Sequence, residues 1–228
     1  MKRILFSALA ALFAVSAFAA NPDEPVYTSD NGKFTFDIFS HMGYGYHAVK
    51  SDAFKASNAG EFFFNIVKFG VYPTGHLGFE LGGDFEYNYF SSKKTFFGLD
   101  SKNLIQVVDF SDFEIGKTLE KPRGGFSLLT FNFPLMVKGI FNDFEVGVGA
   151  EASLNFLGET NISYEVGNTK TQIQQTDAEV NLFTYGVIAT VAYDGMGLYF
   201  KYYPKGSKIL PDGSVDLNFL TIGVAFDF

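Results

Sequence analysis

The segment from Phe144 to Phe156 reads FEVGVGAEASLNF. Its even-numbered positions are all apolar, whereas its odd-numbered positions are Glu, Gly, Ser or Asn. Successive side chains of a β-strand point to opposite faces, so this alternation predicts a strand with one apolar and one polar face.

Seven further segments follow the same two-residue period. They span residues 33–47, 62–72, 76–90, 126–140, 182–193, 196–203 and 217–228. The segment 62–72 is the least clear, because its three consecutive phenylalanines hide the alternation. Lys68 indicates that the even positions there face the polar side. This assignment places on the apolar face Phe63, Val67, Phe69 and Val71.

The connections between these segments alternate in length. Three are short, at residues 73–75, at 142–143 and at Asp194-Gly195, which is a hairpin turn signal. Four are long, at residues 48–61, 91–125, 157–181 and 204–216. Short turns at one end and long loops at the other are typical of outer-membrane barrels. The sequence therefore predicts an all-β fold, an eight-stranded antiparallel up-and-down transmembrane β-barrel.

The apolar face has an order that a soluble core does not need. Aromatic residues gather near the two ends of the strands, and aliphatic or small residues fill the middle. One end has Phe34, Phe36, Phe141, Phe144, Tyr193, Phe226 and Phe228, and the other has Tyr44, Tyr46, Tyr87, Tyr89, Phe156, Phe183, Tyr185 and Tyr202. Two aromatic girdles around an aliphatic band match two headgroup layers with hydrocarbon between them, so we expect this face to contact outer-membrane lipid.

Composition excludes several classes of function. The chain has 228 residues, of which 18% are aromatic and only 18% charged, which argues against disorder. It has no Cys, so Cys-ligated zinc or iron–sulfur sites are excluded, and we expect no metal and no cofactor. Acidic residues outnumber basic ones by 25 to 17 without any basic run, so we expect no nucleic-acid partner.

The first residues have the pattern of an export signal. Lys2 and Arg3 precede an apolar stretch, and Ala17-Phe18-Ala19 matches a signal-peptidase site. We expect a cleavable signal peptide at 1–19, a periplasmic segment at 20–32 and the barrel at 33–228.

The last residues carry a resemblance. Thr221, Gly223, Phe226 and Phe228 have the spacing of a polar residue, a glycine and two final aromatics. This resembles the signal by which the barrel-assembly machinery recognises bacterial outer-membrane barrels. The chain also resembles the small outer-membrane β-barrel domains of Bacteroidetes and, more distantly, the OmpA and OmpX barrels. Their inner strands are similar to 132–135, 147–150 and 198–203.

That resemblance implies export through the periplasm into the outer membrane of a Gram-negative bacterium. It implies no single activity, because such barrels host many functions. We expect a structural or surface-interaction role and no enzymatic one.

Eight strands leave an interior that side chains can just fill. Charged residues on the polar face would point inward and would have to pair there. We predict a polar network that closes the lumen, formed by Asp37, His41, Lys68, Glu80, Asp84, Glu151 and Lys201. The alternative is a narrow, porin-like channel that prefers cations. A more distant one is a barrel enzyme acting on lipid or peptide near His47, although no motif places a Ser or Asp beside it.

The long loops are the expected place for binding. In 91–125, the apolar run 104–110 would either extend two strands or cover the barrel mouth. In 157–181, Gly167-Asn168 indicates a protruding hairpin. We expect an extracellular partner, if any, to bind through these two loops, and we expect the barrel to be a monomer.

Overall fold

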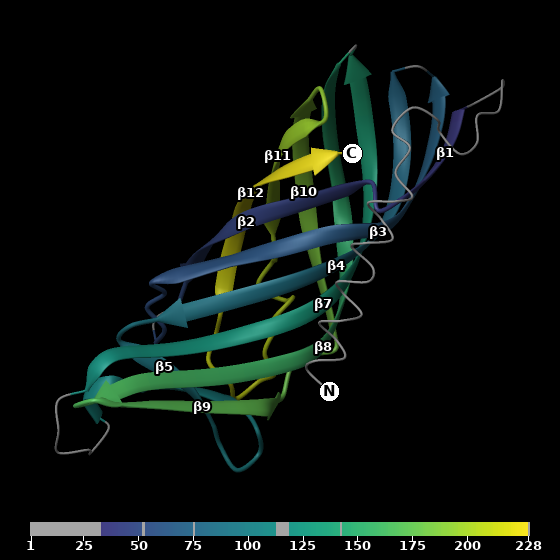
Figure 1. Ribbon diagram of the computed structural model, residues 1–228. Coiled ribbons are helices and arrows are strands. Elements are labelled where there is room, and N and C mark those ends of the chain that lie inside the picture. The colour runs from purple at the N-terminus through teal and green to yellow at the C-terminus, as the bar shows by residue number, and fades with distance from the viewer. Residues whose placement is uncertain (1–32, 52, 75, 113–118, 142, 228) are drawn as a thin grey trace.

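The computed structural model describes residues 33–227 except positions 52, 75, 113–118 and 142. Within this part of the chain, eight antiparallel strands pair into a closed ring, and the predicted all-β barrel is confirmed (Figure 1). Around the ring the strands are β2 (His41–Lys50), β3 (Asn58–Thr74), β4 (Leu77–Ser92), β7 (Glu120–Phe141), β8 (Phe144–Val166), β10 (Phe183–Tyr193), β11 (Met196–Tyr202) and β12 (Asn218–Asp227). The pairing of β12 with β2 closes the barrel. The signal peptide and the segment 20–32 lie outside the described residues.

The two ends of the barrel differ. Short turns join β3 to β4, β7 to β8 and β10 to β11 at one end, here named the turn end. At the β10–β11 turn, Asp194 and Gly195 have φ angles of 48° and 75°, as the predicted hairpin requires. The long connections lie at the opposite end, the loop end. Figure 1 shows the C-terminus and β1 near the turn end, and β5 and β9 at the loop end.

The first predicted strand is interrupted. It is divided into β1 (Lys33–Ile38) and β2 by Phe39 and Ser40, and Phe39 has a φ of 53°. On the neighbouring β3, the register towards β4 shifts between Asn65 and Val67, which marks a β-bulge at Ile66. The Phe39 amide donates to the Ile66 carbonyl at 3.3 Å, so the two irregularities face each other.

This bulge makes one sequence prediction wrong. One extra residue reverses the side-chain alternation, so positions before and after Ile66 have opposite parity. Phe63 is only 5% exposed and points into the barrel, not outward as predicted. Phe69 and Val71, after the bulge, are exposed on the outer surface as expected.

The outer surface of the barrel is apolar. Near its turn end the exposed aromatics include Phe34, Phe141, Phe144, Tyr193 and Phe226, and near its loop end Tyr44, Tyr46, Tyr87, Phe156, Phe183, Tyr185 and Tyr202. Between them lie exposed aliphatic residues that include Ile38, Leu81, Leu135, Val148, Val187 and Ile222. A monomeric soluble protein rarely exposes so large a contiguous apolar surface. The band is what a transmembrane barrel presents to lipid.

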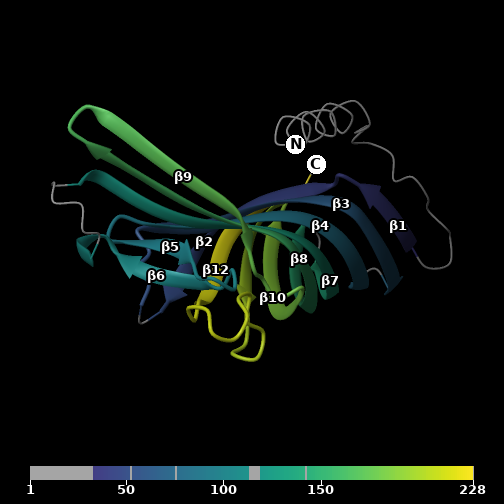
Figure 2. The same cartoon turned by 90° about the horizontal axis from the view of Figure 1, so that it is seen from below.

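Strands continue past the barrel at the loop end. β8 forms a hairpin with β9 (Thr169–Ala178), with Val166 opposite Thr169 across the Gly167-Asn168 turn, so the predicted hairpin is confirmed. A separate two-stranded sheet is formed by β5 (Thr95–Leu99) and β6 (Ile105–Asp109), which a 3-10 turn, η1 (Phe110–Asp112), follows. Figure 2 shows the β8–β9 hairpin projecting away from the barrel.

None of the helical structure in the described residues is long and apolar enough to cross a membrane.

Candidate functional site in the barrel lumen

The centre of the lumen holds one ammonium group among three carboxylates. Lys201 of β11 forms ion pairs with Glu61 of β3, Glu86 of β4 and Glu151 of β8. Its Nζ lies 3.2 Å from Glu61 Oε1 and 3.4 Å from Glu151 Oε2. All four side chains are almost fully buried. We name these four residues the lysine cluster. Because β4 lies opposite β11 in the ring, the cluster spans the lumen.

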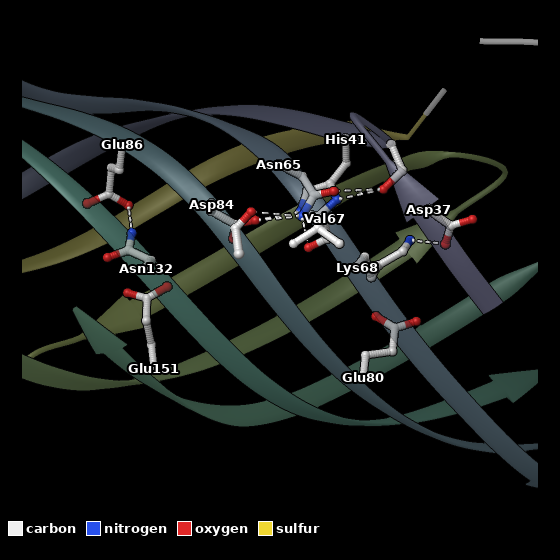
Figure 3. A network of polar contacts seen from close by, with 12 residues as sticks. Asp37, His41, Asn65, Val67, Lys68, Glu80, Asp84, Glu86, Asn132 and Glu151 are labelled. Carbon is white, nitrogen blue, oxygen red and sulfur yellow. Dashed lines mark hydrogen bonds and ion pairs between the residues drawn. The ribbon is translucent and has the colours of Figure 1, made fainter. Parts of the chain in front are cut away.

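Neutral side chains donate hydrogen bonds to the carboxylates of the lysine cluster. Glu86 accepts hydrogen bonds from Asn88 Nδ2 at 2.7 Å and from Asn132 Nδ2 at 2.8 Å, the second of which is drawn in Figure 3. The Tyr203 hydroxyl donates to Glu151 Oε1 at 3.0 Å, and the Thr221 hydroxyl to Glu61 Oε2 at 3.3 Å. Buried charges require such additional bonds, since the attraction between ions alone does not offset the loss of water.

Two aromatic rings lie beside the Lys201 ammonium. Its Nζ is 5.1 Å from the ring centre of Phe63 and 5.7 Å from that of Tyr199. The rings fit because the facing wall is glycine. A Cβ at Gly43 would collide with the Phe63 ring, and one at Gly223 would collide with Tyr199. The inward glycines of the polar face therefore make room for the rings that hold Lys201.

A second set of charges lies nearer the turn end. Lys138 Nζ is 2.9 Å from Glu80 Oε2 and 3.3 Å from Glu145 Oε2. The Tyr72 hydroxyl also donates to Glu80. Lys138 thus joins β7 to both of its neighbours, β4 and β8.

The remaining predicted residues form pairs on β1 to β4. Lys68 Nζ lies 3.7 Å from Asp37 Oδ2, and His41 Nε2 lies 3.8 Å from Asp84 Oδ1. Asn65 Nδ2 donates to the same Asp84 oxygen at 2.8 Å. Figure 3 shows these groups on adjacent strands, with Lys68 directed to Asp37 and Asn65 to Asp84.

A small cavity separates the lysine cluster from the turn end. Its volume is about 90 Å³, room for a few water molecules. Its lining includes Lys201, Tyr199, Lys68, Glu145 and Asp227. Lys201 is the member of the lysine cluster that lines this cavity.

Apolar side chains fill the loop end. We name this group the apolar cap, and it consists of Phe54, Ala59, Phe90, Phe97, Ile105, Phe126, Leu128, Ala178, Tyr203, Ile209, Leu210, Leu217 and Phe219. Phe97 and Ile105 come from β5 and β6, and Ile209 and Leu210 from the connection between β11 and β12. Part of the loop 91–125 thus covers the barrel mouth, which is one of the two arrangements expected.

Backbone hydrogen bonds tie the covering loops together. The Asn181 amide donates to the Ile209 carbonyl at 2.8 Å, and the Val215 amide to the Ile105 carbonyl at 2.9 Å. Tyr203 belongs to the apolar cap and also donates to Glu151, so cap and lysine cluster are in contact. An apolar layer and an ionic layer thus lie one after the other along the lumen.

All seven residues predicted for the lumen network carry partners inside the barrel, but they do not form one cluster. Glu151 and Lys201 meet at the centre, while Asp37, His41, Lys68, Glu80 and Asp84 lie nearer the turn end. The lumen also holds Glu86, Lys138 and Glu145, which lie at inward positions of the predicted strands, and Glu61 and Asn65, which do not.

Sequence reasoning misses Glu61 and Asn65 for different reasons. Glu61 falls in the predicted loop 48–61, although β3 already begins at Asn58. Asn65 precedes the bulge at Ile66, which reverses the parity assigned to that strand. No sequence pattern marks Ile66 as the bulged residue.

The other two histidines, His47 and His76, differ in burial and hydrogen bonding. His47 is fully buried, with Nδ1 2.8 Å from Thr221 Oγ1 and Nε2 3.0 Å from Asn88 Oδ1. His76 is exposed at the turn end, where its Nδ1 lies 3.1 Å from the Ile140 carbonyl oxygen. Among the described residues, no group of three or more His, Asp and Glu side chains is arranged to hold a metal ion.

The C-terminal signature residues have distinct positions. Thr221 is buried between His47 and Glu61, Gly223 lies against Tyr199, and Phe226 is exposed on the outer surface. Phe228 lies outside the described residues.

Comparisons with known proteins add little beyond this geometry. No protein-family model matches the sequence, and no curated protein does. Among solved structures, Ail, the attachment invasion locus protein of Yersinia pestis in complex with the heparin analogue sucrose octasulfate, is 12% identical, with a TM-score of 0.38 over 87% of this chain and 99% of that one. Neisserial surface protein A is 15% identical, with a TM-score of 0.36 over 86% and 97%. A mutant of the porin of Rh. blastica is 8% identical, with a TM-score of 0.21 over 86% and 100%. These likenesses are weak, and the eight-stranded closure rests on the strand pairing of the chain itself.

Proposed function

We propose that the protein is an outer-membrane β-barrel with a structural or surface-interaction role. The exposed apolar band between two aromatic girdles supports a membrane location, since hydrocarbon accepts a sheet only when the sheet closes on itself. The predicted signal peptide and the C-terminal signature support export and recognition by the barrel-assembly machinery. In this orientation the turn end faces the periplasm and the loop end the cell exterior.

The lumen of this barrel does not conduct. One observation carries this proposal: the lysine cluster spans the lumen and the apolar cap fills the mouth above it. An ion crossing the barrel would have to displace Lys201 from three carboxylates and then pass through buried aromatic and aliphatic side chains, which cannot hydrate it. The single-channel conductance of purified protein in planar bilayers tests the proposal. Steady, cation-selective steps would favour the narrow-channel alternative.

The extracellular part serves as a binding surface. Its protruding β8–β9 hairpin and the small β5–β6 sheet rise from a closed, rigid barrel, which is a suitable base for a recognition site. A pull-down from host or environmental material, with and without residues 91–125, tests the contribution of that loop. Equal partner recovery without the loop would leave the hairpin 157–181 as the binding element. We assign the protein no enzymatic activity.

A further inference from the structure

β9 has an unpaired edge outside the membrane band. β9 pairs with β8 along one edge, and no other described strand pairs with its second edge. An exposed strand edge presents unpaired N–H and C=O groups that another strand can bond. The edge of β9 is therefore a site where a chain can be added to the sheet.

The hairpin turn decides which backbone groups of β9 are free. A two-residue turn makes its flanking pair, Val166 and Thr169, a hydrogen-bonded pair, and such pairs recur at every second residue. Thr169, Thr171 and Ile173 consequently direct their backbone groups to β8. Lys170, Gln172 and Gln174 direct theirs to the open edge.

The first seven residues of this edge lack the usual protection against pairing. Natural edge strands are blocked by Pro, bulges or inward-pointing charges. From Thr169 to Gln175 the strand contains no Pro, no acidic residue and a single Lys, Lys170, and it keeps one register with β8; the register shift and Asp177 of β9 lie beyond Gln175. Nothing here opposes the approach of another strand.

One apolar side chain lies at the middle of the edge strand. Ile173 is 40% exposed, and it stands opposite Ile162 of β8, which is buried with Phe96 and Phe110. Opposite residues of an antiparallel pair share a face, so Ile173 extends this apolar cluster to the uncovered edge.

We propose that β9 of a second copy of this chain pairs antiparallel with β9, with Ile173 opposite Ile173. A two-fold symmetric antiparallel pair must join residues that face the same side of the sheet. With Ile173 at the centre, Gln172 faces Gln174 through their free backbone groups, and Thr171 faces Gln175. A shift by two residues would place Ile173 against Thr171 or Gln175, so this register alone joins the two apolar side chains.

This inference rests on the proposed surface role and deepens it by naming the partner, and it replaces the monomer expected from the sequence. The sequence alone does not identify the free edge, because this requires knowing that β9 pairs only with β8 among the described strands.

Cysteine cross-linking tests the register without interference, because the chain has no Cys. Residues in a non-hydrogen-bonded pair have Cα atoms about 4.5 Å apart, within reach of a disulfide. Ile173→Cys alone should form disulfide-linked dimers on mild oxidation. Thr171→Cys alone and Gln175→Cys alone should form several-fold fewer, whereas an equimolar mixture of the two should cross-link. Equal cross-linking of the three single variants would overturn the register.

A proline variant tests the pairing itself. Gln172→Pro removes an amide that points to the open edge and leaves the bonds to β8 intact, whereas Gln172→Ala keeps that amide. In sedimentation experiments in detergent, wild-type protein and Gln172→Ala should dimerise as concentration rises, and Gln172→Pro should stay monomeric. Monomeric wild-type protein throughout, or dimeric Gln172→Pro, would overturn the proposal. Neither result depends on bilayer conductance, which tests the closed lumen separately.

Discussion

The Lys201 ammonium lies 3.2 Å from Oε1 of Glu61, although β11 and β3 are not neighbours in the barrel. With Glu86 and Glu151, this contact fastens non-adjacent strands across the lumen. If these ion pairs across the lumen stabilise the barrel, removing the Lys201 ammonium should lower the free energy of unfolding.

Lys201→Met removes that ammonium and leaves three buried carboxylates without an opposite charge. Breaking a buried ion pair from one side costs about 3–5 kcal/mol, so the free energy of unfolding should fall by roughly that amount. Because the chain has no Trp, urea unfolding in lipid vesicles would be followed by circular dichroism.

Lys208→Met is the matched control for this experiment. Lys208 pairs with Asp212 in an exposed loop, where an ion pair contributes only about 0–1 kcal/mol. Equal destabilisation by the two substitutions would show that the ion pairs of the lysine cluster do not stabilise the barrel more than an exposed ion pair does.

The apolar cap should behave as a packed core although it lies outside the membrane band. Ile105 is fully buried in the cap, so Ile105→Ala should lower the free energy of unfolding by about 2–5 kcal/mol. Lys55→Ala, at an exposed position of the same loop end, should change it by less than about 0.5 kcal/mol. Similar values for both would mean that the loops do not pack over the mouth.

The position of the membrane band can be tested on a single strand. Val148 lies in the exposed aliphatic band of β8, and Val166 lies at the end of the same strand beside the hairpin turn. Val148→Arg should cost about 2–4 kcal/mol, the value for a charge at the bilayer midplane, whereas Val166→Arg should cost about 1 kcal/mol or less. The folded fraction after refolding into vesicles would give the comparison, and an equal loss at the two sites would place the band elsewhere.

The bulge at Ile66 has a direct spectroscopic consequence. By simple alternation Phe63 and Phe69 share a face, but the bulge directs them to opposite sides of the wall. A spin label at Phe69→Cys should be relaxed by oxygen dissolved in the lipid, and one at Phe63→Cys should be protected. Equal oxygen accessibility at both positions would contradict the bulge.

The sequence predicts the strands of the barrel wall better than it predicts the contacts inside the lumen. Two-residue alternation, as in Phe144 to Phe156, predicts each barrel strand because a sheet between lipid and a polar interior needs two unlike faces. The same pattern cannot locate an extra residue, so it assigns Phe63 and Asn65 to the wrong face. It also cannot show that Phe97 and Ile209 join one apolar cap over the mouth, because those contacts depend on how separate loops fold back.

We propose that the lysine cluster and the apolar cap close the lumen, and the current through single molecules in a planar bilayer tests this proposal. Insertion of wild-type protein should be verified independently, by protease digestion of the exposed loops in matched vesicles. We predict no steady single-channel steps from inserted wild-type protein. Regular, long-lived, cation-selective steps from most inserted molecules would contradict the closed lumen.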